Sequence, residues 1–108
     1  MGASVYMDPK QRIQAVIQEL QLITQQSASL RNQIMEIESS INLIENQPKE
    51  LKLYQQRGSI LAELSDRNST SSELAGTKEL LESHVQRLLE KEEEIREEYE
   101  ELVKQIEG

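Results

Sequence analysis

The sequence predicts a mainly α-helical chain, folded into an antiparallel two-helix coiled coil with a β-hairpin at the bend. Two long segments, 9–47 and 77–107, repeat aliphatic residues at alternating spacings of three and four, the pattern of a coiled-coil seam. Between them, 48–76 holds the only strand-like alternation. The 108 residues include no Phe, no Trp and only three Tyr, which argues against an ordinary globular core. We therefore expect a single domain over 1–108.

The first helix is expected over 9–47, after a loose N-terminus at 1–8. Asp8 can cap the helix, Pro9 fits its first position, and Gln11 can complete a capping box. Pro48 ends it, because proline displaces the preceding residue from helical angles. Nine of the ten seam positions are aliphatic, and Ser27 is the exception: Ile13, Val16, Leu20, Ile23, Ser27, Leu30, Ile34, Ile37, Ile41 and Ile44.

The middle segment, 48–76, is expected to hold a linker and the hairpin. A short helical turn over 49–57 would stop at Gly58, since glycine reaches backbone angles closed to other residues. Alternation from Ile60 to Leu64 then predicts one strand. Turn-forming residues at 66–68 predict a reversal, and 69–75 would return as the second strand, although four of its seven residues are Ser or Thr.

The second helix is expected over 77–107, with Thr77 as its cap. Its seam is apolar except at Glu92. That carboxylate would either meet Arg31 or Asn32 across the coil or lean into solvent, and the solvent-facing position is favoured. The seam consists of Leu74, Leu81, Val85, Leu88, Glu92, Ile95, Tyr99, Leu102 and Ile106.

The order of helix, Pro48, Tyr54, the run Gly58-Ser59-Ile60-Leu61 and a second helix resembles the β-class subunit of prefoldin, over about 9–106. A lone two-stranded hairpin is marginal in water and its edges invite pairing, so association through the hairpin is expected. The resemblance implies a β-barrel platform in a hexamer of two α-class and four β-class subunits. The residues expected to support subunit assembly are Tyr54, Gly58, Ile60, Leu61, Ala62 and Leu64.

The resemblance also implies a function: an ATP-independent molecular chaperone subunit. Such a subunit captures unfolded protein clients at the coiled-coil tips and delivers them to a group II chaperonin. Carried over by position, the client contacts are Ile13, Val16, Ile17, Tyr99, Leu102, Val103 and Ile106. For the seam residues alone, ordinary coiled-coil packing is the stronger interpretation. The alternative function is a structural coiled-coil spacer or dimerisation module.

Composition weighs against other classes of protein. The net charge is −8, which disfavours nucleic acid and anionic membrane surfaces as partners. From Lys78 to Glu107 there are eleven Glu against five Lys and Arg, a net of −6. Cysteine is absent and His84 is the only histidine, so no metal, cofactor or enzyme site is expected. The lack of cysteine is compatible with a reducing compartment, and the expected location is cytoplasmic.

Overall fold

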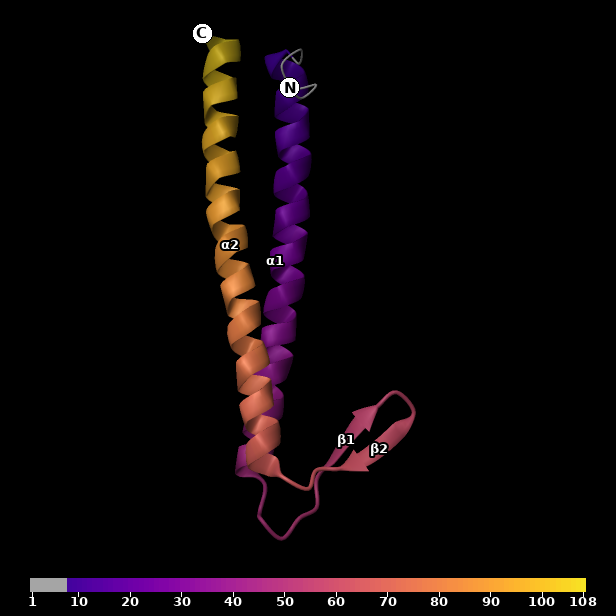
Figure 1. Cartoon of the computed structure of the whole chain (residues 1–108). Coiled ribbons are helices and arrows are strands. Elements are labelled where there is room, and N and C mark those ends of the chain that lie inside the picture. Colours follow the sequence, from indigo (N-terminus) through magenta and orange to yellow (C-terminus); the bar gives the residue numbers. More distant parts are fainter. Residues whose placement is uncertain (1–7) are drawn as a thin grey trace. The chain divides into compact units, whose positions relative to one another are not determined.

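The computed structural model describes residues 8–108. Its elements follow the order α1 (Pro9–Asn46), β1 (Tyr54–Arg57), β2 (Ile60–Glu63) and α2 (Arg67–Glu107) (Figure 1). Two long helices with a β-hairpin between them are therefore confirmed. The loose N-terminus was expected over 1–8, of which 1–7 lie outside the described residues.

The chain forms two compact parts, which we describe separately. The terminal unit comprises the described residues 8–30 and 84–108, from the start of α1 and the end of α2. The central unit comprises 31–83, with the remainder of both helices and the hairpin.

α1 begins at Pro9, as the sequence predicts, and ends at Asn46, one residue before the predicted end at residue 47. The Gln11 backbone N–H donates to Asp8 Oδ1 at 2.9 Å, and the Asp8 N–H donates to Gln11 Oε1 at 3.4 Å. This reciprocal pair is a capping box, which satisfies backbone donors that have no partner in the first helical turn. The helix ends at Asn46, ahead of Pro48.

α2 begins at Arg67, so the predicted start at Thr77 and the predicted strand over 69–75 are wrong. Asp66 is the cap, since its Oδ1 accepts a hydrogen bond from the Ser69 N–H at 3.0 Å. Thr77 lies within the helix, and its hydroxyl donates to the Glu73 carbonyl at 3.1 Å. The capped first turn and a seam that already includes Leu74 make the Ser/Thr-rich segment helical.

The hairpin lies earlier in the chain than predicted. β1 pairs antiparallel with β2, and Arg57 lies opposite Ile60 across a two-residue turn of Gly58 and Ser59. Gly58 has a φ of 61° and Ser59 does not have a positive φ, which fits a type II′ turn. The helical turn predicted over 49–57 is therefore wrong, because 54–57 is the strand that this turn pairs with β2.

An aliphatic cluster forms the core of the terminal unit. Val16 and Ile23 from α1 meet Ile95 and Leu102 from α2, with Ile13, Leu20 and Leu88 packed against them. Early residues of α1 thus meet late residues of α2, so the helices run antiparallel within this unit, as predicted. Each fully buried aliphatic side chain contributes about 1.5–3 kcal/mol.

The polar seam position Glu92 bonds to its own helix. Its Oε1 accepts hydrogen bonds from Arg96 Nε at 3.1 Å and from Arg96 Nη2 at 2.9 Å. The side chain is 20% exposed, so it is neither fully buried nor free in solvent.

Candidate assembly and binding surfaces

The hairpin presents apolar side chains on both of its faces. Directly opposed residues share a face, so the pairs Tyr54–Glu63 and Gln56–Leu61 lie on one side, and Gln55–Ala62 and Arg57–Ile60 on the other. The exposed fractions are 56% for Tyr54, 66% for Ile60 and 68% for Leu61. Two strands therefore expose apolar surface and open edges together, as expected of a segment that pairs with other chains.

All six residues predicted for subunit assembly lie in or beside this hairpin. Five belong to the strands and the turn. Leu64 directly follows β2, and its N–H donates to the Leu53 carbonyl at 2.8 Å, which prolongs the ladder. Leu64 is half-buried, whereas Ala62 is exposed.

A groove of about 350 Å³ lies in the central unit, between the Tyr54 side of the hairpin and the helices. Its apolar lining comes from both helices and from the residues where the chain enters and leaves the hairpin: Leu43, Ile44, Leu53, Tyr54, Leu64 and Leu74. Leu43 and Leu53 were not singled out from the sequence. Leu43 is off the heptad seam of α1 and Leu53 precedes the strand, so neither residue belongs to a periodic pattern.

Arg67 fastens the loop that leads from α1 to the hairpin. Its Nη1 donates to the Gln47 carbonyl at 3.0 Å, and its Nη2 donates to the Pro48 carbonyl at 3.1 Å and also to the Leu51 carbonyl. A guanidinium presents several donors in one rigid plane, so one side chain can hold three carbonyls. The sequence pattern predicts Arg67 only as part of a turn.

The residues predicted to bind clients all belong to the terminal unit, and the structure divides them by exposure. Ile17, Tyr99 and Ile106 are 39%, 36% and 42% exposed. By contrast, Val16 is fully buried and Leu102 is 8% exposed, and both belong to the core cluster. The remaining two, Ile13 and Val103, are half-buried.

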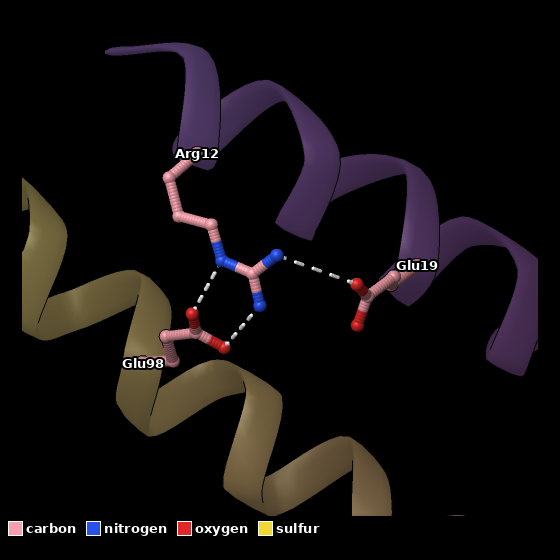
Figure 2. Close-up of polar contacts among 3 residues, drawn as sticks. All are labelled: Arg12, Glu19 and Glu98. Atoms are coloured by element: carbon pink, nitrogen blue, oxygen red, sulfur yellow. Dashed lines mark hydrogen bonds and ion pairs between the residues drawn. The ribbon is translucent and has the colours of Figure 1, made fainter. Parts of the chain in front are cut away.

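An ion pair joins the two helices in the same unit. Arg12 Nε donates to Glu98 Oε1 at 2.6 Å and Arg12 Nη2 donates to Glu98 Oε2 at 3.1 Å, while Nη1 lies 3.9 Å from Glu19 Oε1 (Figure 2). The hydrogen bonds to Glu98, followed by the attraction of Glu98 and Glu19, raise the pKa of Arg12 above its usual value. Sequence reasoning missed this pair, although Arg12 and Glu98 each directly precede a seam residue, where interhelical pairs form in coiled coils.

The remaining charged residues do not converge on one point. Within residues 8–108, no group of three or more His, Asp or Glu side chains is arranged to hold a metal ion. His84 is exposed on α2. Of the helices described here, neither combines the length and the apolarity that a bilayer crossing requires.

Two long antiparallel helices, the first opened by a capping box, with an exposed apolar β-hairpin between them define a class of protein: helical hairpins that carry a small two-stranded sheet at the bend. The model of the prefoldin subunit family matches residues 10–108, almost the whole of this chain. The chain belongs to the prefoldin family, and its similarity is to the β class. Subunits of this family are chaperone components rather than enzymes.

Two relatives carry this similarity, and a third shares the fold. Prefoldin subunit beta of Pyrobaculum calidifontis is 33% identical over 88 residues, which cover 82% of this chain and 70% of the relative. The prefoldin beta subunit of Thermococcus strain KS-1 has a crystal structure that matches with a TM-score of 0.78 at 25% identity, over 88% of this chain and 82% of that one. The beta2 subunit of the same organism shares the fold, with a TM-score of 0.72 at 22% identity over 83% and 95% of the two chains.

Proposed function

We propose that this chain assembles with α-class prefoldin subunits into a cytoplasmic hexamer of two α-class and four β-class chains. In this assembly it captures unfolded proteins at the free ends of its helices and passes them to a group II chaperonin. The observation that carries the proposal is the family match over residues 10–108.

Assembly through the hairpin is supported by its exposed surface. Ile60 and Leu61 expose about two thirds of their area on opposite faces of a sheet that has only two strands. Neighbouring hairpins would bury these side chains and pair the open edges. The groove beside Tyr54 offers further apolar area that a second subunit can cover.

Capture is supported by the exposed apolar side chains of the terminal unit. Ile17, Tyr99 and Ile106 offer modest contacts on each chain. Several arms that hold one unfolded chain act together, because a first contact raises the effective concentration of the next. For delivery, the net charge of −6 over residues 78–107 would favour a basic docking surface on the chaperonin.

The test is suppression of aggregation of a chemically unfolded protein by the assembled complex. Ile17→Ser combined with Val103→Ser should weaken suppression severalfold, since both side chains lie off the seam and neither belongs to the buried cluster. Met35→Ser combined with Leu80→Ser is the matched control, because these residues are 62% and 73% exposed in the central unit. Equal suppression by the wild type and the Ile17/Val103 variant would exclude capture by these side chains.

The spacer function remains the second candidate, and the burial of Val16 and Leu102 in ordinary coiled-coil packing favours it. A spacer would leave aggregation of the unfolded protein unchanged at every concentration. It would also remain a monomer or dimer in the presence of an α-class subunit. Suppression by the wild-type complex would therefore exclude this candidate.

A further inference from the structure

Two of the apolar side chains predicted to contact clients are buried between the helices in this structure. Val16 is fully buried and Leu102 is 8% exposed, both within the core of the terminal unit. An unfolded chain can contact these two side chains only after α1 and α2 part locally. Core packing opposes such parting, and any further contact between the two helices near these side chains lowers their availability again.

The Arg12–Glu98 pair lies one helical turn from both buried residues. Arg12 precedes Val16 by four positions and Glu98 precedes Leu102 by four, so each charged residue neighbours a buried one on the same helix face. In the described part of the chain, two ion pairs join α1 to α2, this pair and Glu38–Lys78. Only Arg12–Glu98 is bidentate (Figure 2).

The exposure of the pair suits an interaction that opens and closes. The side chains of Arg12 and Glu98 are 28% and 38% exposed, so water and salt reach them. A bidentate guanidinium–carboxylate pair is stronger than a single contact, but partial exposure keeps its effect on an opening equilibrium to about fivefold. Glu19 lies beside the same guanidinium and adds attraction from α1 without bridging the helices.

We propose that the Arg12–Glu98 pair is a clasp that sets how often the two helices of the terminal unit part, and thereby how available Val16 and Leu102 are to an unfolded chain. The inference rests on the proposed capture function and adds an interaction that regulates it. Arg12 and Glu98 act here by positioning the helices, and the apolar side chains make the contacts.

Charge reversal tests the clasp in the assembled complex. Arg12→Glu and Glu98→Arg each replace the attraction by repulsion, and the double variant restores an opposite pair. We expect amide hydrogen exchange around Val16 and Leu102 to rise about fivefold or more in each single variant and to fall back in the double variant. Lys78→Glu is the control for Arg12→Glu, because it breaks the Glu38–Lys78 contact of 3.3 Å with the same change of charge, and Glu38→Lys is the control for Glu98→Arg.

Suppression of aggregation should follow the exchange. Each single variant should reach half-maximal suppression at a concentration severalfold lower than the wild type, and the double variant should return toward the wild-type value. Unchanged exchange, or exchange that the double variant does not reverse, would overturn the clasp. Faster exchange without any change in suppression would overturn its control of capture.

A covalent cross-link between the two helices tests the proposal if a reversed charge prevents folding. The chain has no cysteine, so Arg12→Cys with Glu98→Cys provides the only thiols of this chain for a short bifunctional maleimide. The linked complex should lose part of its suppression, while the same variant before linking keeps it. Equal suppression in the two forms would contradict the clasp. If wild-type complex does not suppress aggregation at all, capture itself fails, and the exchange data report separately whether the pair holds the helices together.

Discussion

Gly58 and Gly76 provide a contrast in backbone conformation alone, because a Cβ at either position meets no atom within 4 Å. Gly58 has a φ of 61° in the hairpin turn, a region that costs other residues about 1–2 kcal/mol. Gly58→Ala should therefore lower the free energy of unfolding by about 1 kcal/mol in denaturant titrations. A variant as stable as the wild type would contradict the turn geometry.

Gly76→Ala should have the opposite effect, because Gly76 lies inside α2 without a positive φ. Alanine restricts the unfolded chain and is favoured in helix interiors by about 0.5–1 kcal/mol over glycine. The same titration, or the thermal midpoint, measures the gain. A loss of stability would mean that Gly76 lies outside the helix, as a helix starting at Thr77 would require.

Glu92 holds a seam position with a charged group. Glu92→Leu loses an i,i+4 contact with Arg96 of about 0.3–0.5 kcal/mol but adds apolar burial of a larger size. We expect a net gain of about 1 kcal/mol in the free energy of unfolding. The exposed neighbour Glu93 supplies the control, since Glu93→Leu should change stability by less than about 0.5 kcal/mol. An equal gain at both positions would assign the effect to charge removal rather than to the seam.

At the scale of elements, the sequence predicted the helices better than the hairpin. The long aliphatic repeat and the capping box of Asp8 and Gln11 identify α1 with its ends. The start of α2 was misplaced because Ser and Thr are found in strands and turns as well as in first helical turns. Two signals point to the correct start: Asp66 as a cap, and the heptad row that extends from Leu81 through Leu74 back to Arg67.

The loop between α1 and the hairpin depends on the three carbonyls that Arg67 holds. Arg67→Lys keeps the charge but not the planar set of donors, so we expect a loss of about 1–2 kcal/mol. Hydrogen exchange should quicken at the Leu51 amide, which donates to the Pro48 carbonyl at 3.1 Å. Arg57→Lys is the control, because Arg57 makes one contact of 3.4 Å with Gln55. Equal exchange at Leu51 in both variants would show that Arg67 does not hold the loop.

At the scale of the whole molecule, the sequence predicted that apolar residues gather at the hairpin but not how exposed each apolar side chain is. The six residues predicted for assembly do lie in or beside the hairpin, since a short apolar run beside a glycine turn is visible in the sequence. Seam position did not decide exposure: Val16 is buried, whereas Tyr99 and Ile106 on the same kind of position are 36% and 42% exposed. Such differences depend on how the two helices pack and on interhelical ion pairs such as Arg12–Glu98. The residue pattern of a single helix contains neither.

Assembly with an α-class subunit can be measured as native mass. The wild-type chain mixed with an α-class prefoldin subunit should have the native mass of a hexamer. Ile60→Ser with Leu61→Ser should reduce that mass to smaller species, because the change removes the largest apolar groups from both faces of β2. Helix content by circular dichroism should stay unchanged, since neither residue contacts the buried cluster of the terminal unit.

Leu80→Ser is the matched control for assembly, as Leu80 is 73% exposed on α2, outside the hairpin. The control should assemble as the wild type does. A hexamer formed by the Ile60/Leu61 variant would assign assembly to another surface, of which the groove lined by Leu43 and Leu74 is the next to test. A wild-type chain that stays a monomer or dimer with its partner would instead favour the spacer. Native mass therefore separates a wrong surface from a wrong function, because only the first leaves the wild-type hexamer intact.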